Sequence, residues 1–248
     1  MIDILYLAKG RPEFTAASFE ALLKNTCWTE EVCLVIYTDG LPNDAEALAE
    51  ELGIDPSLAA WDTRCHGGPV AIMNHYLSQH GAEIFAKIDN DVIVPQNWLE
   101  QCLSVMEAHP ELDLLGIEPP ASRTPAPWAT PGVVVRHPEP LAAWDRDGYA
   151  PCGSIGGIGL MRRSAFAGRE PMKPHGPNGV GGFTDWQLRN ADVSKGWIVP
   201  PLSLFLLDRL PVEPWASLSK QYIAEGAQRA WTNYPASASH LWEWWLKR

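Results

Sequence analysis

The chain has 248 residues, which is enough for one large α/β domain or two small ones with a substantial core. Its formal net charge of -11 argues against nucleic-acid binding by the protein as a whole, because phosphate backbones are bound by basic surfaces, and leaves room only for a local basic groove. The same acidic balance argues against resting on an anionic membrane.

The cysteines and the apolar runs bear on the compartment. The five cysteines are odd in number and form no Cys-x-x-Cys pair, which predicts reduced, mostly buried thiols in a cytoplasmic protein. The chain enters a strand pattern at Met1, and the longest late apolar run, 197–207, contains Pro200-Pro201. We therefore expect no secretion signal and no membrane span.

The first part of the chain alternates strands with helices. Residues 4–7 and 32–38 are apolar strands, and the periodic stretches 15–23 and 43–51 are helices. The loop 64–69 leads into a helix over 70–77. Its glycines, followed by proline, expose N–H groups suited to an anion or a nucleotide, or form a flexible loop. His66 and His75 are not spaced like zinc ligands, so we treat them as surface or satisfied polar residues.

The most informative segment runs from Ile84 to Pro95. Its apolar residues predict a strand buried on both faces of a parallel sheet, and ligands bind at the carboxyl ends of such strands. Alternation along the strand puts Asp89 and Asp91 on one side with Asn90 between them. This spacing suits a hard divalent cation, although the same tripeptide is also a common turn.

The rest of the chain completes the fold prediction. A helix is expected over 98–108, a strand over 113–117, a glycine-rich strand and short helix within 153–166, and a late strand over 196–201. Residues 118–151 are rich in proline and lack periodicity, which is typical of a functional loop. We expect an α/β fold with a mostly parallel sheet flanked by helices over 1–210. Residues 211–248 form an aromatic-rich helical extension packed on it.

Together these motifs resemble the GT-A fold glycosyltransferases, closest to family 2. The resemblance covers Ile2 to about Arg209. It rests on Arg11-Pro12 after the first strand, Asp39 after the second, the acidic triplet at 89–91 and the segment 95–99 that follows it. It implies a Rossmann-like sheet and a Mn²⁺ or Mg²⁺ ion held against the diphosphate of a nucleotide sugar, most often a UDP-sugar.

The resemblance also assigns roles. The metal would be held by Asp89 and Asp91. Many family members add a histidine ligand that this chain lacks at the matching position. Asp208 or His175 would take its place, or the diphosphate and water would complete the shell without it. Asp185 would be the general base. It is expected in the first turn of a helix, with Thr184 as the cap of that helix, and the alternative is that Asp185 only favours the positive helix end. Thr184 and Gln187 stand where the family has acids. The residues that would contact the donor are Ala8, Lys9, Arg11, Asp39, Gly68, Asn74, Asp89, Asn90, Gly156 and Gly157.

Lys9 and Arg11 could equally be solvated loop charges, and Asp39 a turn or cap residue. Acceptor contacts are expected from aromatic residues, although burial is the common fate of such side chains. These residues are Trp128, Trp144, Tyr149 and Trp186.

The predicted activity is metal-dependent transfer of a sugar from a nucleotide diphosphate to an acceptor hydroxyl, with inversion if Asp185 is the base. The acceptor could be a saccharide, a protein or a hydroxymethylated base in viral DNA, in which case the compartment is the host cytoplasm. Alternatives are a nucleotidyltransferase that makes a nucleotide sugar, and a binding module without catalysis. Oligomeric state does not follow from the sequence.

Overall fold

The computed structural model describes residues 1–8, 10–38, 59–117, 148–174, 182–198, 205–210 and 212–225. The predicted helix over 43–51, most of the proline-rich loop, and the chain after residue 225 lie outside these ranges. The elements, in chain order, are β1 (Ile2–Leu7), α1 (Pro12–Asn25), β2 (Val32–Tyr37), β3 (Ala59–Asp62), α3 (Pro69–Gln79), β4 (Ile84–Asp89), β5 (Val92–Ile93), α4 (Trp98–Ala108), β6 (Leu114–Gly116), β7 (Tyr149–Pro151), β8 (Gly159–Arg162), η3 (Arg163–Phe166), α5 (Gly182–Arg189), β9 (Lys195–Ile198), β10 (Phe205–Leu206), η5 (Leu207–Arg209) and α6 (Trp215–Ala224).

Eight strands form the main sheet in the order β3-β2-β1-β4-β8-β6-β9-β7. The strands β3, β2, β1 and β4 are parallel neighbours, while β8 runs antiparallel to both β4 and β6. Because β9 is parallel to β6 and β7 is antiparallel to β9, six of the eight strands share one direction. The prediction of a mostly parallel sheet flanked by helices is therefore confirmed.

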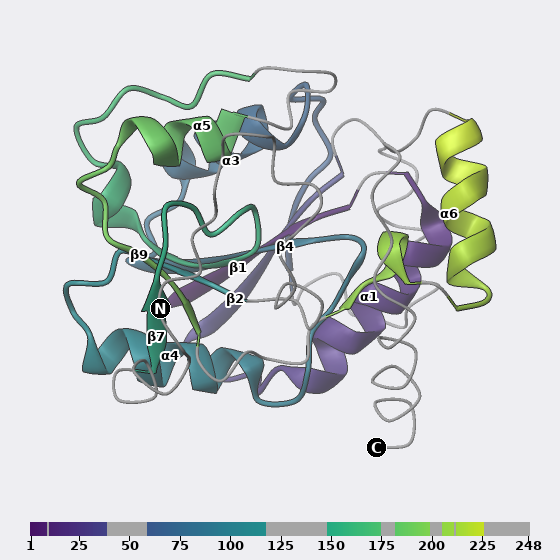
Figure 1. Ribbon diagram of the computed structural model, residues 1–248, viewed down its shortest axis with the longest axis horizontal. Coiled ribbons are helices and arrows are strands. Elements are labelled where there is room, and N and C mark those ends of the chain that lie inside the picture. The colour runs from purple at the N-terminus through teal and green to yellow at the C-terminus, as the bar shows by residue number, and fades with distance from the viewer. Residues whose placement is uncertain are drawn as a thin grey trace.

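Helices cover both faces of the sheet (Figure 1). Alternate side chains of β1 separate into two buried clusters: Ile4 and Tyr6 pack with α1, α4 and α6, whereas Leu5 and Leu7 pack with α3 and α5. This alternation follows from the two-residue period of a strand, and it explains why the buried strands read as continuous apolar runs. The result is a three-layer α/β/α arrangement.

Several local predictions are corrected. The apolar segment over 84–95 is two strands, since β5 leaves the main sheet and pairs antiparallel with β10. The strand β3, whose apolar run is short, was not predicted. Thr184 lies inside α5, which begins at Gly182, so it does not cap that helix. The cysteines are free thiols, but only Cys102 is buried, so the prediction of mostly buried thiols is wrong.

Helix α6 packs on the first helix through aromatic side chains. The ring of Phe14 lies 5.9 Å from that of Trp215 and 5.3 Å from that of Tyr222. The Tyr222 hydroxyl also donates a hydrogen bond to Glu13. Part of the predicted aromatic extension is therefore packed against α1. Within the described residues, no helix is both long enough and apolar enough to cross a bilayer.

Candidate active site

The acidic triplet lies where the sequence places it, at the carboxyl end of β4. Asp89 is the last residue of that strand and is partly exposed, with 34% of its side chain accessible, whereas Asp91 is almost buried. Pairing of β5 with β10 then brings the next segment of the chain alongside, and the Leu207 N–H donates to the Asp91 carbonyl at 2.7 Å. Asp208, the residue that follows, is thereby placed next to the triplet.

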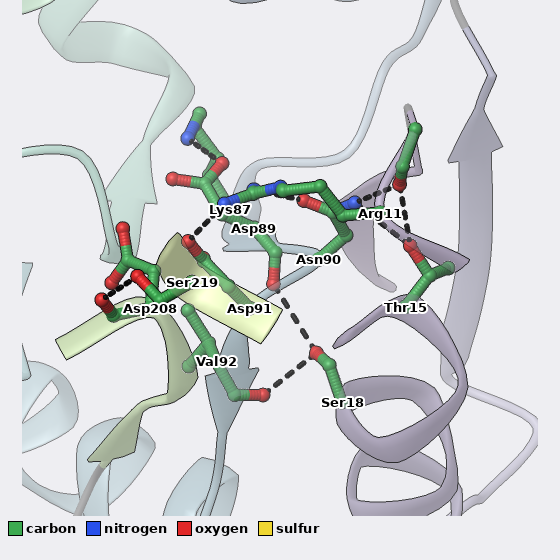
Figure 2. Close-up of polar contacts among 11 residues, drawn as sticks. Arg11, Thr15, Ser18, Lys87, Asp89, Asn90, Asp91, Val92, Asp208 and Ser219 are labelled. Carbon is green, nitrogen blue, oxygen red and sulfur yellow. Dashed lines mark hydrogen bonds and ion pairs between the residues drawn. The ribbon is translucent and has the colours of Figure 1, made fainter. Parts of the chain in front are cut away.

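We call Arg11, Asp89, Asn90, Asp91 and Asp208 the triplet corner. Figure 2 shows the carboxylates of Asp89, Asp91 and Asp208 on one side of the backbone, with the Arg11 side chain reaching across Asn90 to Asp91. Segments separated by some 200 residues of sequence thus meet at the carboxyl edge of the sheet, where α/β proteins bind ligands.

Arg11 joins the first loop to the triplet. Its Nη1 donates to Asp91 Oδ2 at 3.0 Å and its Nη2 donates to Asn90 Oδ1 at 2.6 Å. Burial favours the neutral guanidine, but the charges of Asp91, Asp208 and Asp89 outweigh it, so the pKa of Arg11 is raised. Arg11 also has a left-handed backbone (φ 55°) as the residue before α1, a conformation that is costly for a side chain with a Cβ. Arg11 is therefore held in place by the fold and is not a solvated loop charge.

Asn90 faces away from the carboxylates. Its amide nitrogen donates to the carbonyl of Gly10 at 3.0 Å and to the Thr15 hydroxyl at 2.8 Å, and the residue is only 4% exposed. With Arg11 on its amide oxygen, this side chain ties the triplet to the start of α1. The structure therefore shows a structural role for Asn90, and the donor contact predicted for it stays a prediction.

A buried lysine supports the other end of the triplet. Lys87, two residues before Asp89 on the same face of β4, donates through Nζ to Asp89 Oδ1 and to the Gly157 carbonyl at 2.9 Å. A Cβ on Gly157 would lie 3.6 Å from Lys87 Nζ and 3.9 Å from Asp89 Oδ2. Gly157, a predicted donor-binding residue, is thus a direct neighbour of the triplet.

The glycine-rich loop before β8 is held by a residue that the sequence resemblance treated only as a departure. Gln187 is fully buried; its Oε1 accepts from the Ile155 N–H at 2.8 Å and its Nε2 donates to the Gly156 carbonyl at 2.9 Å. A carboxylate could accept the first bond but could not donate the second. An amide is therefore the side chain that this position requires, and through it α5 is connected to the loop beside Asp89.

A glycine in the next strand serves packing. A Cβ on Gly159, which has φ +153°, would lie 2.2 Å from the carbonyl oxygen of Leu115. This glycine lets β8 approach β6 closely. Close approach of Gly156 and Gly157 to a donor sugar stays a prediction.

Two more predicted site residues make contacts that hold elements of the fold together. Asn74 on α3 exchanges two hydrogen bonds with the backbone of Met172, at 2.8 and 3.0 Å. Trp186 is 2% exposed, stacks on Phe166 with ring centroids 4.5 Å apart, and donates its indole N–H to the carbonyl of Glu170. Trp186 is thus a core residue rather than a stacking surface for an acceptor.

A cavity of about 500 Å³ lies beside these two residues. It is bounded by α3, η3, the segment after η3 and α5, and none of its lining residues belongs to the triplet corner. The cavity is therefore separate from the chemistry predicted at β4.

The remaining candidates are placed as follows. Ala8 directly follows β1 and donates its N–H to the Tyr37 carbonyl, and Gly68 precedes α3 with φ 112°. Tyr149 lies on the edge strand β7, four strands from β4, with its ring 4.9 Å from that of His109. Asp185 is half-buried in the first turn of α5. Five predicted residues lie outside the described ranges: Lys9, Asp39, Trp128, Trp144 and His175.

The donor set of the triplet corner fits a hard divalent cation, because Asp89, Asp91 and Asp208 offer only carboxylate oxygens. A second group of metal-binding side chains lies elsewhere. In the described part of the chain, Asp62, His66 and His75 are the one trio whose ligand atoms all lie within 4.8 Å of one another. The two histidines that the sequence set aside are therefore brought together by the fold. No sequence signal marked them, since the spacings of four and nine residues span a strand end, a loop and a helix.

Comparison with solved structures identifies the architecture. S. aureus TarS (residues 1–349) superposes with a TM-score of 0.54 at 12% identity, over 97% of this chain and 68% of that one. The mannosyltransferase PcManGT from Pyrobaculum calidifontis, solved with GDP-Man and Mn²⁺, gives 0.55 at 15% identity over 98% and 69%. Glucosyl-3-phosphoglycerate synthase from Mycobacterium tuberculosis, solved with Mn²⁺, UDP and glucosyl-3-phosphoglycerate, gives 0.55 at 15% identity over 90% and 77%.

The chain has the GT-A fold. The prediction of a GT-A-like sheet is confirmed by these superpositions, while identities this low carry the fold and not the activity. No family model matches the sequence, and no curated protein matches it. What the GT-A fold does in this chain must therefore be inferred from its own residues.

Proposed function

We propose that this chain is a metal-dependent glycosyltransferase that moves a sugar from a nucleotide diphosphate, of which UDP is the first to test, to an acceptor hydroxyl. The observation that carries the proposal is the triplet corner: three carboxylates from two chain segments lie at the carboxyl edge of a GT-A sheet, next to a glycine loop. TarS has been solved with UDP-GlcNAc, and two other GT-A neighbours with Mn²⁺.

The charges of the corner suit a diphosphate bound with a cation. Three carboxylates face two cationic side chains, those of Arg11 and Lys87, which are both largely buried and fixed by hydrogen bonds. Asp89, Asp91 and Asp208 would hold Mn²⁺ or Mg²⁺. That ion would supply neutralisation of the charge that develops on the leaving diphosphate.

The protein's own groups divide the remaining work. Gly157 borders Asp89, and a Cβ on Gly156 would meet open space, which leaves room for the donor sugar beside the carboxylates. Lys87 fixes both Asp89 and the Gly157 carbonyl, and Gln187 fixes the rest of the loop. Asp185 takes the proton of the acceptor hydroxyl on its carboxylate, and the hydroxyl oxygen attacks the anomeric carbon with inversion.

The test measures donor turnover and donor binding separately. Purified chain is mixed with UDP-glucose or UDP-GlcNAc and Mn²⁺, UDP release is measured, and UDP binding is followed by calorimetry. We expect Asp89→Asn to weaken UDP binding in Mn²⁺. We expect Asp185→Asn to bind UDP normally and to lose about 10²- to 10⁴-fold in turnover, the range for removal of a general base. Asp192→Asn, on an exposed loop, is the control for a lost carboxylate.

Two other results would replace the proposal, and a third would identify its acceptor. UDP binding with no turnover in any metal would indicate a binding module without catalysis. In such a module, Arg11 and Lys87 would neutralise the carboxylates of Asp91 and Asp89. Release of pyrophosphate from a nucleoside triphosphate and a sugar phosphate would show a nucleotidyltransferase. Transfer to a hydroxymethylated oligonucleotide, run beside a saccharide mixture, would keep the activity and identify DNA as the acceptor.

A further inference from the structure

Three side chains with metal-binding atoms converge at the end of β3. Asp62 is the last residue of the strand, His66 is in the loop that follows, and His75 is on the second turn of α3. The Nε2 atoms of the two histidines lie 3.2 and 3.3 Å from Asp62 Oδ2, and their rings are 4.4 Å apart, inclined by 31°. We call Asp62, His66 and His75 the imidazole cluster.

The cluster is sheltered by the sheet. Tyr37, the register partner of Asp62 on β2, has its ring 5.4 Å from the His66 ring and 6.0 Å from the His75 ring. Tyr37 is fully buried, yet its hydroxyl has no hydrogen-bond partner among the described residues. A buried hydroxyl without a partner costs free energy, and it points to a polar group that belongs in this site besides the protein's own side chains.

The guanidinium of Arg64 binds the Asp62 carboxylate of the cluster. Arg64 donates to both oxygens of Asp62 and contacts His75 Nε2 at 2.8 Å. Its side chain is 68% exposed, in contrast to 11% for Asp62 and 12% for His66. Arg64 can therefore turn out into solvent at small cost and leave the cluster to another cation.

We propose that the imidazole cluster binds a zinc-class divalent ion, with Asp62, His66 and His75 as its three protein ligands. Two imidazole nitrogens and one carboxylate oxygen form a donor set that transition metals prefer over Mg²⁺, and three such ligands leave a fourth position for water. The ion ties β3, the loop and α3 together just before Gly68, so it fixes the loop that leads to α3. This site shares no residue with the triplet corner.

The experiment measures zinc binding to the full chain in the presence of excess Mg²⁺, which occupies all-oxygen sites. Metal-free protein is titrated with Zn²⁺ against a chromophoric chelator. We expect one zinc ion per chain, and at least about tenfold weaker binding in His66→Gln and in His75→Gln. Arg64→Ala should bind zinc at least as tightly as the wild type, because the guanidinium competes for Asp62.

Matched controls separate these ligands from their neighbours. His80→Gln removes a histidine directly after the same helix, 3.9 Å from Asp3, and Cys65→Ser removes the exposed thiol beside His66. Both should bind zinc like the wild type. Absence of a one-to-one complex, or equal affinity in the two histidine variants and the controls, would overturn the site.

A measurement on the unaltered chain guards against variants that fail to fold. X-ray absorption at the zinc edge should show two imidazole rings and no sulfur in the coordination shell. A shell of oxygens alone, or one that contains a thiolate, would reject these three residues as the ligands.

Discussion

The triplet corner and the imidazole cluster each hold an aspartate against an arginine, yet the two arginines differ. The side chain of Arg11 is 14% exposed, has a strained backbone and bonds two residues of the triplet, whereas that of Arg64 is 68% exposed and bonds Asp62 from the solvent side. The pair Arg11–Asp91 is part of the buried structure that holds the site, which we call the frame. In the pair Arg64–Asp62, the arginine can turn away into solvent, and we call it the cover. A short Arg–Asp contact alone therefore does not tell whether a carboxylate is committed to the fold or available to a ligand.

The largest effect expected from this contrast is on stability. Arg11→Ala should lower the free energy of unfolding by about 3 kcal/mol, because it leaves the buried Asp91 and Asn90 without their cationic partner. Arg64→Ala should change it little, because that side chain is largely exposed. Urea unfolding of both variants measures the difference. Equal losses would show that the two pairs are equivalent and would remove the distinction between frame and cover.

How much of this could be predicted from sequence follows from the same contrast. Asp89, Asn90 and Asp91 are contiguous at the end of an apolar run, so strand alternation predicts their location. The outward or inward orientation of Asn90 depends on Gly10 and Thr15, about 80 residues earlier in the chain, and no local pattern encodes it. Asp62, His66 and His75 come together only because β3 pairs with β2 and α3 packs on that face.

The element boundaries show the same limit. The helix over 98–108 was predicted at its observed bounds, because its apolar residues recur at helical spacing. The strands β5 and β10 have two residues each, and such short strands exist only through their pairing. Asp208 approaches the triplet through that pairing, so its position became evident only in three dimensions.

A second prediction extends the frame of the triplet corner to its glycine loop. Gln187→Glu restores the acid that the family resemblance favours, but it should lower the free energy of unfolding by about 2 kcal/mol, since the Gly156 carbonyl loses its donor and a charge is buried. The loss should shrink at acidic pH, where a protonated carboxyl can donate to that carbonyl. Thermal and urea unfolding at two pH values measure it.

The control for this change is Leu188→Glu, which adds the same charge at the next, exposed position of α5. It should be nearly neutral. If Gln187→Glu and Leu188→Glu lower the free energy of unfolding by the same amount, the Gln187 amide does not hold the glycine loop. Lys87 would then be the residue that joins this loop to the triplet corner.

A third and smaller effect separates α3 from the cluster that it carries. Asn74→Ala removes both hydrogen bonds to Met172 and should lower the free energy of unfolding by about 1 kcal/mol, because the side chain is only half-buried and water can reach the freed backbone. Zinc affinity should stay unchanged, although Asn74 precedes His75 directly. Weaker zinc binding in this variant would mean that the cluster depends on the segment near Met172.

The smallest effect is expected at an Arg–Asp pair that belongs to neither region and provides the exposed reference. Arg169 donates to Asp192, and this bond holds the pKa of Asp192 below its usual value. A carboxyl whose pKa is lowered by folding adds stability above its unfolded pKa of about 3.9, and that stability is lost as the pH falls through the folded pKa. Wild type should thus exceed Asp192→Asn slightly near neutral pH, and the two should converge in acid. Unfolding free energies measured across that range check the trend, and a gap that widens in acid would contradict it. Because Asp192 is largely exposed, a loss as large as that of Arg11→Ala would mean that burial does not determine how much an Arg–Asp pair stabilises this protein.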